Sequence, residues 1–453
     1  MTAPVESRPG RSGAPLRRLA LPAAALATAA AVGLRVRAKR RVAWPVPDDA
    51  ISASGARDHT TQLLARPRLT RHDLAMSLAP SHATSVEPLL HGRRYFPRIL
   101  EDIEAATDHV HLLIYGYKEG DIGRRFLEAL SAKVAEGVEV RLAVDAIGSE
   151  IDGGSKGLYR ELVAAGVQVV ANEGLLSFRT GPLGARRQTR HVADLLHFDH
   201  RKMVVIDGRI GWVGGSGIED HYNDERFYDV MCRMSGPIVA QLALVFLATW
   251  RYRGGPAPAD IDRYFPPDVV ATPDVATAIP ATLLWNVPGT GHHPISDAIE
   301  RSLEDAVDGI DIVNPYISNR AILGRLLAAS ERGVRVRLVA PGKPTPPFPA
   351  AAFRHAYPAL LDAGAEIVLH PEMAHAKVVR VDDRVLIGGC NLDDLSLFRN
   401  DELDVLFEHP TMPALAEASV FDELVGMSQS AAASDGRRAR AWEATMSRVS
   451  RFL

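Results

Sequence analysis

Cysteine, net charge and stacked aromatic residues are all scarce in this chain of 453 residues, and each scarcity excludes a class of protein. Two cysteines, Cys232 and Cys390, are too few for a disulfide framework, and both lie in apolar stretches that we expect to be buried strands. A formal net charge of −3 argues against a general polyanion binder. Aromatic residues make up 6% of the chain and do not alternate with basic ones as they do where bases stack, so no nucleic-acid partner is expected.

A long apolar run is also missing. The candidate span, Leu19 to Leu34, is about sixteen residues long and contains Pro22, which leaves it just under the length that crosses a bilayer. Basic residues flank it on both sides, and the heavier cluster, from Arg35 to Arg41, follows it. This pattern favours a short anchor in the cell membrane, with the rest of the chain in the cytoplasm, over a cleaved signal peptide. A peripheral tail fits the same residues.

Lysine supplies only seven of the 52 basic residues, and two of these seven lie in a pattern that occurs twice, 175 residues apart. The pattern is His-x-Lys, then four residues, then Asp, followed by a Gly-Gly pair. The two copies are His200, Lys202, Asp207, Gly214 and Gly215, and His375, Lys377, Asp382, Gly388 and Gly389. A chance match to the three-residue spacing is expected on the order of once in fifty such chains, and two matches are far rarer.

Each copy predicts a hairpin of two strands. The residues between the lysine and the aspartate are β-branched and apolar, as in a mostly buried strand, and Asp207-Gly208 and Asp382-Asp383 are turn signals before a second apolar run. Because residues i and i+2 of a strand share a face, the histidine and the lysine of each copy point toward one site. The glycine pairs would let the backbone come close to a ligand.

The sequence around the two patterns repeats as well. Residues 108–117 correspond to 308–317, and residues 136–142 correspond to 331–338. Each half reads helix, strand, helix, strand, helix and strand hairpin, which predicts an α/β fold made of two repeated domains, each a mixed sheet flanked by helices. We expect a basic and apolar segment at 1–45, linkers at 46–87 and 254–281, domains at 88–253 and 282–425, and a basic tail at 426–453. The tail would rest on an anionic lipid surface or form an ordinary amphipathic helix.

On these residues the chain resembles the phospholipase D superfamily and, within it, the bacterial cardiolipin synthases. The resemblance covers roughly residues 88 to 425. Its further anchors are residues 115–121, 138–145 and 314–316, and the run from Asn391 to Glu402, which is similar to the family's Asn-Leu-Asp-x-x-Ser-x-x-x-Asn-x-Glu segment. The resemblance implies two phospholipase D-like domains with one active site at their pseudo-twofold interface, in a monomer that is an internal pseudo-dimer.

The implied reaction moves a phosphatidyl group from one phosphatidylglycerol to another and gives cardiolipin and glycerol. A phosphodiester needs cations at its oxygens, a nucleophile, and an acid for the leaving alkoxide. Lys202 and Lys377 would supply the charge, so no metal and no other cofactor is expected. By the resemblance, His200 is the nucleophile that forms a phosphohistidine and His375 is the acid and base. The near symmetry of the two copies leaves the reverse assignment open.

Further polar residues are candidates for orienting the imidazoles or binding phosphate, namely Ser216, Asp229, Asn391, Ser396, Asn400 and Glu402. Asp229 and Glu402 occupy matching places downstream of the two motifs and are the better candidates for holding the histidines. Asp207 and Asp382 are either catalytic or structural at their turns. The family has Asn as the second residue after each Gly-Gly pair, whereas the first copy has Ser216-Gly217, so phosphate binding there would rely on Ser216 or on backbone N–H groups.

Other functions stay open at this point. A hydrolase of the same superfamily, a phospholipase D or a nuclease, would pass the phosphohistidine to water. A membrane-anchored binding protein would keep the fold without turnover, but the intact His and Lys pairs argue against it. His197, Asp199 and His200 resemble a metal cluster, yet neighbours on a strand point to opposite faces and no further ligand lies close in sequence.

Overall fold

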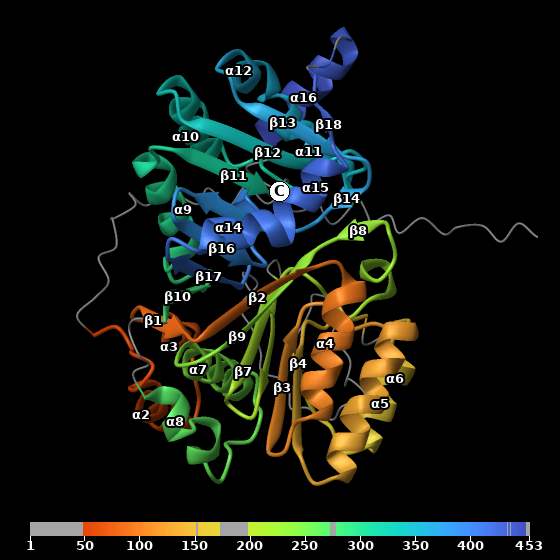
Figure 1. Ribbon diagram of the computed structural model, residues 1–453. Helices are drawn as coiled ribbons and strands as arrows, with labels where there is room; N and C mark the ends of the chain where they lie inside the picture. Colours follow the sequence, from red (N-terminus) through yellow and green to blue (C-terminus); the bar gives the residue numbers. More distant parts are fainter. Residues whose placement is uncertain are drawn as a thin grey trace, which may run out of the picture. The chain divides into compact units, whose positions relative to one another are not determined.

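Figure 1 shows the computed structural model, in which each half of the chain builds one mixed β-sheet. The structure describes residues 49–150, 153–172, 198–271, 278–432, 434 and 436–449, all of which belong to one compact unit. The expected membrane anchor at 19–34 and His197 lie outside the described residues.

The first sheet has seven strands in the order β2-β9-β7-β6-β3-β4-β5. Strands β3, β4 and β5 are parallel, whereas β6, β7, β9 and β2 continue the sheet as antiparallel neighbours. Helices α4, α5 and α6 pack on one face of it (Figure 1). The bounds are β2 Ser85–Leu90, α4 Gly92–Glu104, β3 His109–Ile114, α5 Asp121–Ala135, β4 Glu139–Val144, α6 Lys156–Ala164, β5 Gln168–Ala171, β6 Lys202–Ile206, β7 Ile210–Gly214 and β9 Val230–Ser235.

The second sheet repeats this order and adds one short strand at each edge, giving β1-β10-β17-β16-β15-β11-β12-β13-β18. The bounds are β1 Ser81–Ala83, β10 Ile279–Asn286, α9 Pro294–Asp305, β11 Gly309–Val313, α10 Arg320–Glu331, β12 Arg335–Pro341, α11 Pro347–Arg354, α12 Tyr357–Asp362, β13 Glu366–His370, β15 Val378–Val381, β16 Arg384–Gly388, α13 Asp394–Phe398, β17 Glu402–Glu408, α14 Met412–Ala416, α15 Asp422–Gly426 and β18 Gln429–Ser430. The strand-by-strand correspondence of the two sheets confirms the predicted repeat of two mixed α/β domains.

One apolar helix, α7 (Ile238–Tyr252), joins the two halves through a shared core. Every residue from Ile238 to Trp250 is buried, as expected of a helix that is apolar on all sides. Its side chains belong to one core cluster together with strands of the first sheet and of the second, such as Val213 of β7 and Ile387 of β16. The halves therefore pack against each other over a continuous apolar surface. Among the described residues, no helix combines the length and the hydropathy needed to cross a bilayer.

The segments expected to be linkers or a tail contain regular structure. Residues 46–87 hold α2 (Ala56–Leu64), α3 (Arg71–Leu74) and β1, and β2 begins at Ser85; residues 254–281 hold a 3-10 turn (Asp262–Tyr264), α8 (Pro267–Val270) and the start of β10; the tail holds β18 and α16 (Arg437–Val449). Composition did not indicate these elements because short helices gain their stability from packing on larger ones. For example, Gln241 of α7 donates hydrogen bonds to the carbonyls of Ile51 and Ala79, at 3.0 and 2.8 Å.

The hairpins β6–β7 and β15–β16 are those that the two motifs predict. Their turns begin at Asp207 and Asp382, which have φ angles of 52° and 51°. Lys202 pairs with Ile114, at the carboxyl end of β3, and Val378 pairs with Val313, at the carboxyl end of β11. Both His-x-Lys segments therefore lie at the carboxyl ends of parallel strands, where open α/β sheets bind ligands.

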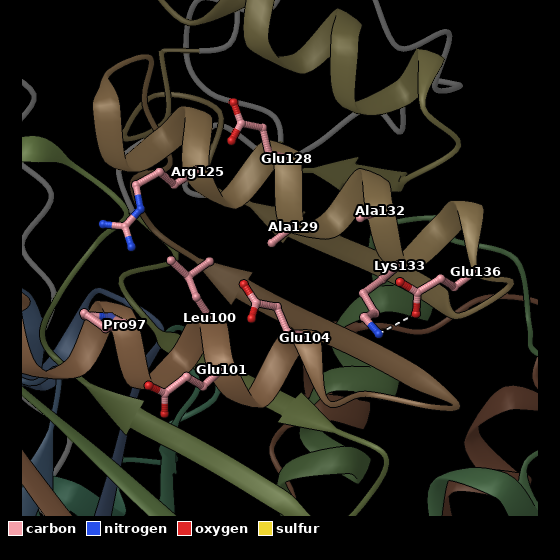
Figure 2. Close-up of a pocket in the computed structure, with 10 residues that line it drawn as sticks. All are labelled: Pro97, Leu100, Glu101, Glu104, Arg125, Glu128, Ala129, Ala132, Lys133 and Glu136. Carbon is pink, nitrogen blue, oxygen red and sulfur yellow. Dashed lines mark hydrogen bonds and ion pairs between the residues drawn. The ribbon is translucent and has the colours of Figure 1, made fainter.

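A groove of about 610 Å³ lies between α4 and α5 (Figure 2), away from both His-x-Lys segments. Its lining includes Glu101, Glu104, Glu128 and Arg125, and an ion pair between Lys133 and Glu136 borders it. Lys133 also donates to the carbonyl of Ala106, so the groove lies toward the start of β3, whereas the His-x-Lys segments lie where β3 and β11 end. We therefore look for the chemistry at the interface of the two halves.

Candidate active site

Each His-x-Lys segment is held by the backbone of the other half. The N–H of His200 donates to the carbonyl of Asp401 at 3.0 Å, and the N–H of Asp401 donates to the carbonyl of Phe198 at 3.0 Å. The N–H of His375 donates to the carbonyl of Tyr228 at 2.7 Å. Just before His375, β14 (Met373–Ala374) pairs with β8 (Phe227–Tyr228). These contacts place the two histidines at one interface, as the resemblance implied.

Two buried carboxylates hold the imidazoles, and each comes from the opposite half of the chain. The oxygens of Glu402, at the start of β17, lie 2.9 and 3.1 Å from Nδ1 of His200. Oδ2 of Asp229, between β8 and β9, lies 2.6 Å from Nδ1 of His375. Both carboxylates are fully buried. Because a carboxylate engages Nδ1 of each ring, Nε2 is the nitrogen of each ring that can face a substrate; Nε2 of His375 also lies 3.2 Å from the ammonium of Lys377.

Lys202 and Lys377 are almost completely buried beside these rings. The ammonium of Lys202 contacts the carbonyl of His200 and lies 4.9 Å from the centroid of the Tyr115 ring. The ammonium of Lys377 lies 2.6 Å from Nδ1 of His375 and 3.5 Å from Oδ2 of Asp229. Burial lowers the pKa of Lys202 to about 7 and also lowers the pKa of Lys377. A bound phosphodiester anion would raise both pKa values again because it supplies a compensating charge.

Charged residues from both halves of the chain shift the pKa of each histidine. Burial, reinforced by Lys377, lowers the pKa of His375 to about 3. Burial, reinforced by Lys202 and by Lys377 of the other half, lowers the pKa of His200 well below its ordinary value. Both imidazoles are therefore neutral at pH 7 in the free protein, which is the form that a nucleophile and a general base require.

The two carboxylates differ in protonation. Burial alone would raise the pKa of Asp229, but Lys377 and His375 outweigh it and lower that pKa below its ordinary value. Burial raises the pKa of Glu402 to about 8, and Lys202 only partly opposes this. The buried Asp404 has a pKa raised to about 7, by burial and by Glu402. His375 thus faces the more acidic of the two carboxyl groups, and His200 faces the less acidic one.

Asp207 and Asp382 are not part of this site, so the structural reading of these residues is favoured over the catalytic one. The carboxylate of Asp207 accepts the N–H groups of Thr107, Asp108 and His109, each at 2.9 Å. Asp382 accepts the N–H groups of Val307, Asp308 and Gly309 at 2.9 to 3.0 Å. Each aspartate lies five residues along the strand from its lysine, roughly 16 Å away at about 3.3 Å per residue. They fasten the turn of each hairpin to the start of β3 or β11.

Ser216 and Asn391 follow the two glycine pairs and differ in their surroundings. The hydroxyl of Ser216 accepts a hydrogen bond from Tyr95 and donates one to the carbonyl of Gly217, both at 2.8 Å, so its proton is not directed at a phosphoryl oxygen. Asn391 is 8% exposed, and within the described residues its side-chain oxygen has no hydrogen-bond partner. Asn391 therefore keeps an acceptor for a hydroxyl group of the substrate, whereas the hydroxyl of Ser216 is engaged within the protein.

Ser396 and Asn400 form hydrogen bonds to the groups that position His200. The hydroxyl of Ser396 hydrogen-bonds to Glu402. The side-chain oxygen of Asn400 accepts the N–H of Phe198 at 3.1 Å, two residues before His200. The first of these contacts fixes the carboxylate that holds His200, and the second fixes the segment that carries it.

The glycine pairs make room for carboxylates rather than for a ligand. A Cβ atom at Gly215 would collide with the carboxylate of Asp229, and a Cβ atom at Gly388 would collide with that of Asp404. Oxygen Oδ1 of Asp404 accepts the N–H of Gly389 at 2.9 Å. As predicted, other atoms come close to the backbone at these glycines, but they belong to side chains of the protein itself and not to a ligand.

Sequence reasoning did not identify the aromatic wall of the site or Asp404. The ring centroid of Tyr115 lies 4.9 Å from that of His200, and the rings of Tyr222 and Phe227 lie 5.7 and 5.8 Å from that of His375. Tyr115 entered the sequence analysis only as an anchor of the resemblance. For Asp404 the available signal was its position two residues after Glu402, on the same face of β17.

The residues that resembled a metal cluster are engaged otherwise. Asp199 is buried and forms ion pairs with Arg201 and Arg253. Among the residues that the structure describes, no three His, Cys, Asp or Glu side chains are gathered as metal ligands would be.

Comparisons with known proteins agree with this geometry. A family model described as "Cardiolipin synthase, PLD-like domain" matches residues 99–250 and 299–424. Cardiolipin synthase 1 of Staphylococcus epidermidis is 30% identical over 69% of this chain and 61% of the relative. The major cardiolipin synthase ClsA of Bacillus subtilis is 31% identical over 71% of this chain and 64% of the relative. The match thus spans between 61 and 64% of the length of these relatives.

The fold has a counterpart among solved structures. The crystal structure of phosphatidylserine synthase from Haemophilus influenzae superposes with a TM-score of 0.62, covering 88% of this chain and 100% of that one at 15% identity. The two segments that match the family model contain both His-x-Lys motifs and both carboxylates that hold the histidines. The chain therefore belongs to the family of phospholipase D-like domains found in cardiolipin synthases.

Proposed function

We propose that this protein is a phosphatidyltransferase that joins two phosphatidylglycerol molecules into cardiolipin and releases glycerol. The observation that carries the proposal is the pair of imidazoles, His200 and His375, each held at Nδ1 by a buried carboxylate and each accompanied by a buried lysine. Such a site accepts one phosphodiester anion and offers it a nucleophile on one side and a proton donor on the other. The relatives named above are cardiolipin synthases, which favours transfer over hydrolysis.

The reaction proceeds in two displacements. First, Nε2 of His200 attacks phosphorus, the P–O bond to the glycerol headgroup breaks, and His375 gives a proton to the leaving oxygen. Binding of the anionic phosphodiester raises the pKa of His375, so that the ring carries this proton. His375 then takes the proton of a hydroxyl on the second phosphatidylglycerol, that oxygen attacks phosphorus, and the P–N bond breaks. Lys202 and Lys377 neutralise the phosphoryl oxygens throughout.

The same proposal places the catalytic unit at the cytoplasmic face of the cell membrane, as a monomer. The C-terminal helix α16 supports contact with anionic lipid because its arginines 437, 438 and 440 are exposed and Trp442 is 53% exposed. Its one acidic residue, Glu443, is buried against Arg354. Basic and aromatic side chains on one exposed helix are typical of binding to an anionic membrane surface.

The test is incubation of the purified protein with phosphatidylglycerol in mixed micelles. We expect cardiolipin and an equal amount of glycerol. Phosphatidic acid as the sole lipid product would show a hydrolase, and cleavage of a nucleic acid without lipid turnover would overturn the lipid reading. With labelled phosphatidylglycerol, His375→Ala should form a phosphoenzyme slowly, because the leaving oxygen lacks its proton donor, and keep it, because the acceptor hydroxyl lacks its base, whereas His200→Ala should form none. A phosphoenzyme seen only in His200→Ala would reverse the roles of the two histidines.

A further inference from the structure

The two halves of the site are equivalent in backbone but not in side chains, and the pairing of strands shows which residues correspond. An isolated bridge pairs Tyr117 with Ile218 in the first half, and the matching bridge pairs Ile317 with Leu392 in the second half. Gly217 therefore takes the place of Asn391, and Gly116 takes the place of Tyr316. Two side chains that the second half contributes near the active site are absent from the first.

The carboxylate of Glu219 fills the space that these two glycines leave. A Cβ atom at Gly217 would lie 2.9 Å from Oε1 of Glu219, and a Cβ atom at Gly116 would overlap the same oxygen. The residue equivalent to Glu219 is Asp393, whose carboxylate accepts the N–H of Ser396 and caps α13. The longer side chain of Glu219 makes no such cap and reaches the vacated space instead.

Glu219 is a neighbour of both aromatic residues that border the histidines, because its Oε1 lies against Gly116, the residue after Tyr115, and its carbonyl accepts the N–H of Tyr222 at 3.2 Å. Burial and then Asp145 are the larger causes of the raised pKa of Tyr115, but Glu219 also contributes to it. In the same way, Glu219 adds to the effects of burial and Asp229 on the raised pKa of Tyr222. Tyr115 packs on His200 and Tyr222 packs near His375, so Glu219 is one residue contact away from each reacting group.

The carboxylate keeps acceptor capacity for a ligand. Among the described residues, its ion-pair partners are the ammonium of Lys118 at 3.1 Å and the ring of His221 at 3.7 Å. The side chains of Glu219 and Lys118 are 12% and 30% exposed. A carboxylate only accepts hydrogen bonds when ionised, and it repels a phosphoryl oxygen. Its fitting partners are hydroxyl groups, and two oxygens can receive two neighbouring hydroxyls at once.

We propose that Glu219, supported by Lys118, is a specificity-determining residue that binds the vicinal diol of a glycerol headgroup. This inference rests on the proposed phosphatidyl transfer and adds to it the recognition of the headgroup. The first half would select the diol through Glu219, while the second half would contact the phosphoryl group through the Asn391 amide. An alcohol with one hydroxyl uses that group for attack on phosphorus, so the partly buried carboxylate keeps Lys118 and His221 but gains no donor from the substrate. A site built to bind hydroxyl groups discriminates against such an analogue.

The test compares two acceptors of the same carbon number, deuterated glycerol and 1-propanol, with phosphatidylglycerol as donor in mixed micelles and products resolved by mass spectrometry. The full-length wild-type protein should favour glycerol over 1-propanol in kcat/KM. In Glu219→Gln the ratio should fall roughly tenfold, because one charge-assisted pair of hydrogen bonds is lost. Glu219→Asp keeps the charge but shortens the side chain, which moves the carboxylate away from the diol. This variant should therefore also lower the ratio of kcat/KM for glycerol to that for 1-propanol.

Glu150→Gln is the matched control, since Glu150 also pairs with Lys118, at 3.2 Å, but does not fill the glycine space. Its acceptor ratio should equal that of the wild type. A ratio unchanged in Glu219→Gln would overturn the inference while leaving phosphatidyl transfer intact. A preference for ethanolamine over both alcohols that depends on Glu219 would assign a cationic headgroup and also overturn it. Absence of any phosphatidyl product from the wild type would instead refute the proposed function.

Discussion

Each half of the chain supplies the carboxylate that holds the histidine of the other half, and this arrangement predicts which residues are energetically coupled. Asp229→Asn should couple more strongly to His375→Gln than to His200→Gln, although Asp229 and His200 belong to the same half. Asp229 is fully buried, and its Oδ2 lies 2.6 Å from Nδ1 of His375. A hydrogen bond to a charged group contributes about 1.5–3 kcal/mol to stability. A double-mutant cycle on the free energy of unfolding should therefore give a coupling energy of that size.

The assay is denaturant unfolding followed by circular dichroism for the wild type, the three single variants and the two double variants. Because it does not depend on turnover, catalytically inactive variants can be included. The cycle of Asp229→Asn with His200→Gln should give a clearly smaller coupling energy, because Asp229 acts on His200 through its charge and through the shared Lys377 rather than through a direct hydrogen bond. A coupling of Asp229 to His200 as large as that to His375 would refute the cross-paired site.

Two further outcomes follow from the structure. Asp382→Asn should lower the free energy of unfolding at pH 7 by about 1 kcal/mol without changing kcat, after allowance for solvent screening. Because three N–H groups outweigh burial and lower the pKa of Asp382, this difference should begin to shrink below about pH 3.8 and vanish once the pH falls below the lowered pKa. A loss of kcat at full stability would contradict the structural role. If His200 is the nucleophile, the rate of phosphoenzyme formation in rapid-quench experiments should rise between about pH 6 and 8. The reason is that the Glu402 carboxyl, with its pKa raised to about 8, must lose its proton for Nε2 of His200 to become nucleophilic. A rate independent of pH over this range would point to His375, beside the ionised Asp229, as the attacking residue.

The chemistry and the repeat were predictable because they are local in sequence. The spacing of His200 and Lys202, and of His375 and Lys377, puts an imidazole and an ammonium on one face of a strand wherever that strand lies. Turn signals after each strand fixed the hairpins. The short elements before β2 and between the halves were not predictable, since their stability comes from contacts with α7 and the two sheets rather than from their own sequence.

The roles of single polar residues depended on partners that are distant in the chain. In the sequence, the aspartates of the two motifs look like members of the site, whereas the structure ties them to the N–H groups that begin β3 and β11. Ser216 looked free to bind phosphate, but Tyr95, 121 residues away, occupies its hydroxyl. Sequence spacing gives no information about such partners.

The sequence by itself determined that this protein carries two copies of one phosphoryl-transfer motif on two repeated α/β domains. Only the tertiary structure decided that Asp229 holds the histidine of the second half and Glu402 that of the first, because packing of the two sheets around α7 brings the carboxyl ends of β3 and β11 together. The same packing put Glu219 where two glycines had left space. Sequence periodicity indicates on which face of a strand or helix a residue lies, whereas long-range packing determines which residue it contacts.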